Sequence, residues 1–303
     1  MKVLGLMSGT SMDGLDCCLS DLKINNNNLS YKVIKSKSFN FCSKDKSIIY
    51  NYIFNKKYTE KYIHDYLGEL FSKYCIDFLN GQSTDLIAMH GQTVSHVDKK
   101  YSIQLGNPQI INKKLNLPIL YNFREFDIKN GGNGAPLVPY LDWLLFKENT
   151  FNTLSINIGG ISNLSFIKNK CKKNEIIGFD TGPGMCLVDQ YVKEKWNIDI
   201  DFNGELSKKG FIDSNLLSYL LANDFIKRKP PKSASTEMYN NIFLSKISKK
   251  FSLINKYNFL RTLLNFTAKS IKKNVDLFIN EKLTDNDKII ISGGGVKNKT
   301  LFN

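Results

Sequence analysis

Arginine is scarce in this sequence of 303 residues, although its formal net charge is +14. It occurs only at Arg124, Arg228 and Arg261, so almost all of the positive charge comes from lysine. Proteins that read nucleic-acid bases directly depend on arginine forks, and no basic stripe with interleaved aromatic residues stands out here. We therefore expect no nucleic-acid partner. We interpret the lysine excess as mild attraction for anionic small molecules such as nucleotides.

Paired cysteine motifs and long apolar runs are missing as well. The six cysteines form no C-x-x-C pair and no zinc-ligand spacing, and scattered thiols are typical of the reducing cytosol. No run reaches the roughly 18 apolar residues that a membrane span needs, and Asp13 and Asp16 follow the short apolar N-terminus at once. The sequence thus predicts a cytoplasmic protein with no membrane partner.

The sequence is instead rich in short strand-like runs and in turns of small polar residues. Apolar periodicity and turn residues predict an α/β chain of alternating strands and helices. In chain order, strands are expected over residues 3–7, 15–19, 31–41, 86–89, 117–122, 154–158, 164–167, 176–179 and 288–291, and helices over 59–79, 185–195, 211–225 and 254–279.

The first two strands enclose a turn made of glycine, threonine, serine and aspartate. This pattern predicts a β-hairpin over residues 3–19 whose tip offers backbone N–H groups and hydroxyls to a polyphosphate. Gly9 and Gly14 have the spacing of a P-loop, but Leu15 stands where that motif needs its lysine. A plain hairpin turn without a ligand is the alternative interpretation.

A run of glycine and proline over residues 131–139 marks the expected domain boundary. The first domain would therefore span residues 1–130 and the second 131–303. Just before the boundary, Arg124 would either bind an anion or form a surface ion pair. Upstream, a buried strand is expected to end at the polar loop 90–93, which is a common position for a ligand site in α/β folds.

The second half opens with the same chemistry as the first. Gly159 and Gly160 begin a small polar turn between two strands, which predicts a second hairpin. A later strand runs into Asp180-Thr181-Gly182-Pro183-Gly184, ahead of an expected helix. Asp180 would then either face a ligand or serve as a helix cap.

Two such hairpins, together with a late buried strand that ends in Gly293-Gly294-Gly295, resemble the superfamily of actin, hexokinase and the heat-shock ATPases. The resemblance implies two ribonuclease-H-like (actin-like ATPase) domains, each with a mixed sheet of the five-stranded type flanked by helices, and an ATP cleft between them. Within this superfamily the sequence is similar to the anhydro-N-acetylmuramic acid kinases. The matching segments, in family order, are residues 7–14, 90–93, 104–106, 123–124, 131–139, 157–164, 180–184, 231–233 and 293–295.

The resemblance implies a bacterial, cytoplasmic, ATP-dependent kinase of peptidoglycan recycling and amino-sugar catabolism. Such a kinase opens 1,6-anhydro-N-acetylmuramic acid with water and phosphorylates its 6-oxygen, which yields N-acetylmuramic acid 6-phosphate and ADP. A homodimer is what the family suggests. By the same resemblance, Asp180 is the catalytic base and Asp13 holds Mg²⁺. The nucleotide-binding residues are Gly9, Thr10, Ser11, Met12, Asp13, Gly14, Leu15, Asp16, Gly159, Gly160, Gly293, Gly294 and Gly295, and the substrate-binding residues are His90, Gln92, Arg124, Gly134 and Asp180.

Several positions depart from the family pattern and keep a second hypothesis open. Asn122 and Asn203 stand where the family has aspartate, Met185 stands where it has asparagine, and residues 234–236 replace a Thr-Gly-Arg run. Only residues 296–303 follow the last glycine motif, whereas the family continues further. A truncated or degenerate, non-catalytic nucleotide-binding relative is therefore the alternative to an active kinase.

Overall fold

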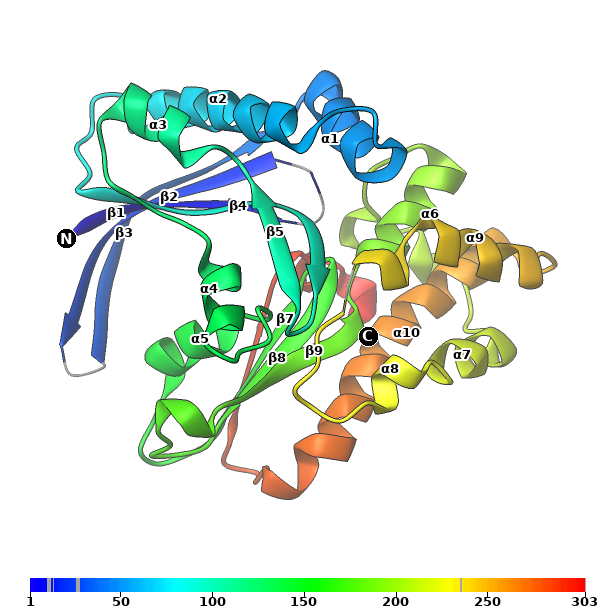
Figure 1. Cartoon of the computed structure of the whole chain (residues 1–303). Coiled ribbons are helices and arrows are strands. Elements are labelled where there is room, and N and C mark those ends of the chain that lie inside the picture. The colour runs from blue at the N-terminus through cyan, green and yellow to red at the C-terminus, as the bar shows by residue number, and fades with distance from the viewer. Residues whose placement is uncertain (10–11, 13, 26–27, 235, 303) are drawn as a thin grey trace. The chain divides into compact units, whose positions relative to one another are not determined.

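The computed structural model describes the chain except residues 10, 11, 13, 26, 27, 235 and 303 and the side chains of residues 236, 237 and 281. Contacts divide it into two compact units, Met1–Gly134 and Ala135–Asn303 (Figure 1). The boundary expected from sequence lay between residues 130 and 131. Gly134 instead groups with the first unit, where its N–H donates to Asp127 Oδ2 and its carbonyl accepts from Arg124 Nη1.

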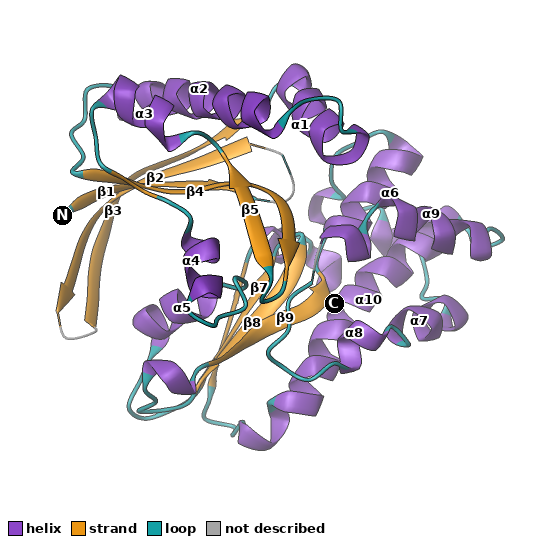
Figure 2. Cartoon of the chain, in the orientation of Figure 1, coloured by secondary structure: helices purple, strands orange, loops and turns teal. Residues whose placement is uncertain are grey.

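The first unit is a mixed sheet with α1, α2 and α3 along one face (Figure 2). Its strand order is β3-β2-β1-β4-β5, with β6 paired to β4; β1, β2 and β3 run antiparallel, and β4 runs parallel to β1. Three antiparallel strands followed by a strand parallel to the first form the ribonuclease-H-like topology. The elements are β1 (Lys2–Ser8), β2 (Gly14–Asn25), β3 (Asn28–Asn40), α1 (Ser43–Asn55), α2 (Glu60–Leu79), β4 (Leu86–Val97), β5 (Tyr101–Leu105), α3 (Pro108–Leu115), β6 (Ile119–Leu120) and α4 (Phe123–Lys129).

Helix α2 shows how the sequence builds this layer. Thr59 caps it by accepting a hydrogen bond from the Tyr62 N–H, as its sequence position predicts. Ile63, Leu67 and Phe71 lie on one helical face and are fully buried against the sheet. Burying each such side chain contributes about 1.5–3 kcal/mol, so packing of this face, more than helix propensity, holds α2 in place.

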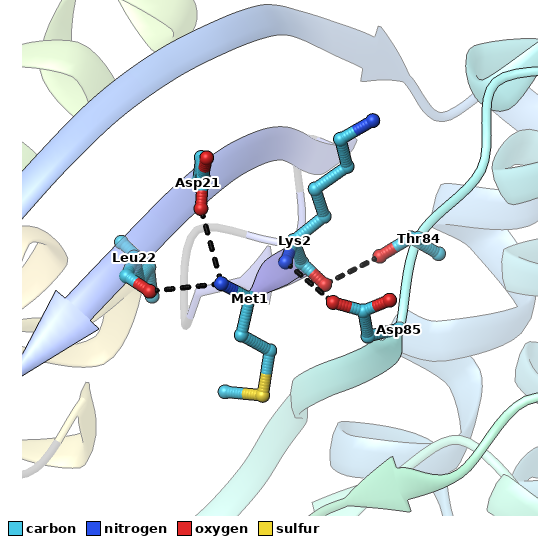
Figure 3. A network of polar contacts seen from close by, with 6 residues as sticks. All are labelled: Met1, Lys2, Asp21, Leu22, Thr84 and Asp85. Carbon is cyan, nitrogen blue, oxygen red and sulfur yellow. Dashed lines mark hydrogen bonds and ion pairs between the residues drawn. The ribbon is translucent and has the colours of Figure 1, made fainter.

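The first strand is held from both sides at its beginning (Figure 3). The terminal ammonium of Met1 donates to Asp21 Oδ1 and to the Leu22 carbonyl, both at 3.1 Å, on the β2 side. On the β4 side, the Lys2 N–H donates to Asp85 Oδ2 at 2.8 Å, and Thr84 Oγ1 donates to the Lys2 carbonyl at 3.1 Å. These contacts stabilise the pairing of β1 with its two neighbouring strands, at the end of β1 away from the first hairpin turn.

The prediction of a loop at residues 90–93 is wrong, because these residues lie inside the long strand β4. Gln92 and Thr93 pair with β5, with a register shift between Thr93 and Ser95, so β4 continues past its buried part as a two-stranded ribbon. Sequence periodicity did not predict β5 or helices α1, α3 and α4. The strand expected over 117–122 is reduced to the two residues of β6.

The second unit repeats the topology of the first. Its described sheet has the order β10-β7-β8-β9; β7, β8 and β9 are antiparallel, and β10 runs parallel to β7. The elements are α5 (Val138–Phe146), β7 (Thr153–Ile158), β8 (Ile161–Ile167), β9 (Ile177–Pro183), α6 (Cys186–Trp196), α7 (Ser214–Leu221), α8 (Asp224–Lys227), α9 (Asn241–Lys250), α10 (Lys256–Phe278) and β10 (Lys288–Ser292). Both units are thus ribonuclease-H-like, which confirms the expected fold class.

Helices cover this second sheet from both faces. One face packs on a large core to which α6, α7, α9 and α10 contribute, whereas Trp143 of α5 packs with Ile167 on the other. The helix expected over 211–225 is interrupted, because α7 ends at Leu221 and Asn223 then caps the separate helix α8. The last strand was expected to be buried, but Ile289 and Ile291 are 58% and 40% exposed, and β10 is an edge strand of the described sheet. Among the described residues, no helix is both long and apolar enough to span a membrane.

Candidate active site

Asp180 lies near the end of β9, at a bulge that periodicity could not predict. Asn163 pairs with Asp180 and Ser162 pairs with Gly182, so Thr181 is an extra residue on β9. The bulge is held by a 2.7 Å hydrogen bond between the hydroxyls of Ser162 and Thr181, both fully buried. Because an extra residue re-aims the side chains beside it, the bulge sets the direction of the Asp180 carboxylate.

Asp180 is 6% exposed and is held by the loop that contains residues 231–234. Its N–H donates to the Lys232 carbonyl at 3.0 Å, and its Oδ2 accepts from the Ala234 N–H at 2.8 Å. The loop therefore fixes the orientation of the carboxylate.

Helix α10 supports the turn that follows Asp180. Thr267 Oγ1 donates to the Gly184 carbonyl at 2.6 Å, and Asn274 Nδ2 donates to the Thr181 carbonyl at 2.9 Å. Both side chains are fully buried, so these bonds form out of water, where polar groups need their partners most. Periodicity predicted this helix and placed Thr267 on its apolar face, but it gave neither Thr267 nor Asn274 a role in the site.

Three glycine-containing segments meet at the carboxyl end of β7. The Gly184 N–H donates to the Gly160 carbonyl at 2.9 Å, and a Cβ on Gly184 would lie 2.1 Å from the Gly159 oxygen. A Cβ on Gly293 would lie 2.6 Å from the Ile158 oxygen, whereas one on Gly294 would have no neighbour within 4 Å. The glycines thus allow backbone to pack on backbone and leave Gly294 open on its own unit.

The start of helix α6 lies beside the same turn. The Met185 and Cys186 N–H groups donate to the Gly159 and Gly160 carbonyls at 2.8 and 3.1 Å. The amino end of a helix of this length carries partial positive charge, which favours a nearby anion. Met185, where the family pattern has asparagine, packs its side chain into the core of this unit.

In the first unit, the base of the hairpin is tied to β4 by Gln92. Ser8 Oγ donates to Gln92 Oε1 at 2.6 Å, and Gln92 Nε2 donates to the Gly9 carbonyl at 2.7 Å. Gln92 is fully buried, so in this unit its amide contacts the hairpin backbone. A Cβ on Gly14 would lie 2.1 Å from the Phe39 oxygen, which explains why β2 begins with glycine.

The remaining residues of the first hairpin differ in burial and in their hydrogen bonds. Met12 has a positive φ of 57°, and its N–H donates to the Gly9 carbonyl at 3.4 Å. Leu15 is a buried core residue, and Asp16 is exposed and accepts from Ser38 Oγ. Thr10, Ser11 and Asp13, expected to bind nucleotide and metal, lie outside the described residues. No cluster of three His, Cys, Asp or Glu side chains suited to a metal occurs in the described part of the chain.

His90, Arg124 and Gly134 form one hydrogen-bonded chain in the first unit. Arg124 Nε lies 2.8 Å from His90 Nε2, and Arg124 Nη1 donates to the Gly134 carbonyl at 2.9 Å. Since a guanidinium only donates, His90 Nε2 must accept, and its Nδ1 then carries the proton that it donates to the Gly91 carbonyl at 2.8 Å. Three of the expected substrate-binding residues are therefore brought together.

The His90 imidazole should make the folded protein sensitive to acid. Burial and the Arg124 charge lower its pKa from 6.5 to about 4, so the unfolded chain binds this proton more readily than the folded one. We expect the contribution of neutral His90 to the free energy of unfolding to be complete above pH 6.5. It should fall by up to about 3 kcal/mol as the pH drops through 4. Urea unfolding at pH 7.5, 6 and 5 should show a smaller acid loss for His90→Gln than for the parent protein. Parallel curves would contradict this prediction.

The model of the anhydro-N-acetylmuramic acid kinase family matches residues 1–303. A protein of that name from Clostridioides difficile (strain 630) is 34% identical over 316 residues, covering 100% of this chain and 82% of its own. One from Bacillus cereus (strain 03BB102) is 34% identical, with 99% and 82% covered. The match to a solved ROK family protein from Streptococcus pneumoniae TIGR4 has 11% identity and covers 100% of this chain and 83% of that protein. Its TM-score of 0.35 adds nothing to the fold assignment.

Proposed function

Because this chain belongs to the anhydro-N-acetylmuramic acid kinase family, we propose that it opens and phosphorylates 1,6-anhydro-N-acetylmuramic acid with ATP. The product is N-acetylmuramic acid 6-phosphate, an intermediate of cell-wall recycling and amino-sugar catabolism. The observation that supports this proposal most strongly is Asp180 near the end of β9, a nearly buried residue whose N–H donates to the Lys232 carbonyl and whose carboxylate accepts the Ala234 N–H.

Asp180 serves as the general base in this proposal. Water is a poor nucleophile, so a positioned carboxylate that accepts its proton lowers the barrier to attack on the anomeric carbon. The water oxygen bonds to that carbon while the internal acetal bond breaks toward the 6-oxygen, which becomes the acceptor of the γ-phosphoryl group. The Ala234 N–H and the bulge at Thr181 hold Asp180 in one orientation, so little reorganisation accompanies the proton transfer.

The two glycine hairpins are the proposed nucleotide-binding elements, each on its own unit. In the second unit, the open backbone at Gly160 and the start of α6 suit an anion, because a Cβ on Gly160 would have only the Cys186 Cβ, at 3.9 Å, within 4 Å. Gly294 is likewise open and suits the approach of a flat ring. A divalent metal, which we propose to be Mg²⁺ held near Asp13, neutralises phosphate charge when bound.

His90, Arg124 and Gly134 are the proposed sugar-binding group of the first unit. Arg124 is oriented by its hydrogen bonds to His90 and Gly134, and a guanidinium held in one orientation is a suitable donor to the lactyl carboxylate of the sugar. Asn122, at the start of α4, donates its amide to Glu125 at 3.1 Å. Within the part of the chain that the structure describes, no contact of Asn122 or Met185 favours the alternative of a non-catalytic relative. We further propose a cytoplasmic homodimer, on the family relationship alone.

The purified protein should convert the anhydro-sugar to its 6-phosphate only when ATP and a divalent cation are both present. We expect turnover with Mg²⁺, loss of turnover with excess EDTA, and its return when Mg²⁺ is restored, because the developing phosphate charge needs a metal counter-ion. Mass spectrometry of the product and coupled detection of ADP measure both halves of the reaction. A folded sample that binds ATP yet forms no sugar phosphate would overturn the proposal.

A further inference from the structure

Lys232 is a buried lysine that the proposed chemistry does not use. It lies on the loop between α8 and η4 (Thr236–Tyr239) and is only 1% exposed. Its ammonium donates to the Phe225 and Ile226 carbonyls of α8, each at 3.0 Å. Because a charged side chain in a core is strongly unfavourable unless it is paired, such a lysine calls for a specific role.

The surroundings of the ammonium form a cage that favours a cation. Its Nζ lies 5.5, 4.9 and 5.2 Å from the ring centres of Phe179, Phe225 and Phe278. Phe179 immediately precedes Asp180 in β9, so the cage includes the strand that carries the proposed base. Ring faces and helix carbonyls together replace much of the hydration that the ammonium loses on burial.

The same residue contacts Asp180 through its backbone. The Lys232 carbonyl accepts the Asp180 N–H at 3.0 Å, and two residues further along, the Ala234 N–H donates to the Asp180 carboxylate at 2.8 Å. The side chain of Lys232 thus fixes the loop to α8, while the backbone of that loop holds Asp180. Each of these contacts lies within the second unit.

We propose that Lys232 is a positioning residue: its caged ammonium ties residues 231–234 to α8 so that the backbone of this loop keeps the Asp180 carboxylate in its reactive orientation. Two charged groups act on this ammonium, Asp180 and Arg228 at the end of α8. Burial, and next Arg228, lower the pKa of Lys232 to about 8, whereas Asp180 raises it.

The inference rests on the proposed function of Asp180, and the test separates the two. Lys232→Met keeps the length and apolar stem of the side chain but removes the charge and the donors. Lys232→Gln, which keeps a neutral N–H donor, is the second variant if the methionine form does not fold. Lys35→Met is the matched control, because Lys35 also donates to a backbone carbonyl, that of Phe78, and lies over its ring, but in the first unit.

Two readouts are needed, amide hydrogen exchange by NMR and steady-state kinetics. In the folded Lys232 variant we expect the Asp180 and Ala234 amides to exchange at least about 10-fold faster and kcat to fall about 10- to 100-fold, with the ATP Kd within about twofold. The Lys35→Met control should leave these amides and kcat unchanged. Unchanged exchange, or faster exchange with unchanged kcat, overturns the inference. If the parent protein shows no turnover, the proposed function fails, and the exchange rates alone decide whether Lys232 holds the loop.

Discussion

Asp180→Asn should lower kcat by about 10²- to 10⁴-fold while leaving the ATP Kd within about twofold. Asparagine has nearly the shape of aspartate and can still accept the Ala234 N–H through its carbonyl oxygen, so the loop contact should survive. It cannot accept a proton from water at neutral pH, so the attack loses its base. Steady-state assay of sugar phosphate formation and calorimetric ATP titration measure the two quantities separately.

Asp201→Asn is the matched control for this substitution. Asp201 is also nearly buried, at 4% exposed, and also accepts backbone N–H groups, those of Leu206 and Ser207. Loss of its charge should lower the unfolding free energy by about 1–3 kcal/mol, but kcat of the folded fraction should stay within about threefold. If Asp180→Asn retained kcat, the general base would have to lie elsewhere. If both variants lost kcat alike, the effect would be structural.

Gly184→Ala should lower both the stability of the second unit and its affinity for ATP. Its Cβ would lie 2.1 Å from the Gly159 oxygen and 3.1 Å from the Gly160 oxygen, and both are backbone atoms that cannot rotate away. The turn after β7 and the turn after β9 must therefore separate. We expect a loss of about 1–3 kcal/mol in unfolding free energy and at least about a 10-fold weaker ATP Kd, because the amides of the β7–β8 turn would be displaced.

Gly5→Ala supplies the comparison for this prediction. Gly5 lies in β1, and its added Cβ would meet only the Cys18 oxygen, at an ordinary 3.6 Å. Its unfolding free energy should stay within about 0.5 kcal/mol of the parent value, the range of substitutions that disturb no packed group. Urea unfolding and ATP titration of both variants provide the measurements. An unchanged ATP Kd in folded Gly184→Ala would show that contact between these turns does not matter for the nucleotide.

Local patterns predicted the parts of the fold whose residues are close in sequence. Both hairpins, helix α2 with its Thr59 cap, and helices α6 and α10 follow from periodicity and turn chemistry, because each depends on neighbouring residues. Strands that form only by pairing with residues distant in the sequence were not predicted. Residues 90–93 looked like a loop because glycine and polar side chains dominate there, yet they continue strand β4, and Gln92 and Thr93 pair with β5.

The same distinction applies to the candidate site. The sequence by itself determined the family, the two glycine hairpins and the candidate base Asp180, because these are carried by contiguous motifs. Only the tertiary structure decided what holds Asp180: the bulge at Thr181 and the Ala234 N–H, 54 residues away along the chain. Periodicity describes which face of an element is apolar, but it carries no information about which distant backbone groups meet a given carboxylate. That is set when the packed elements bring them together.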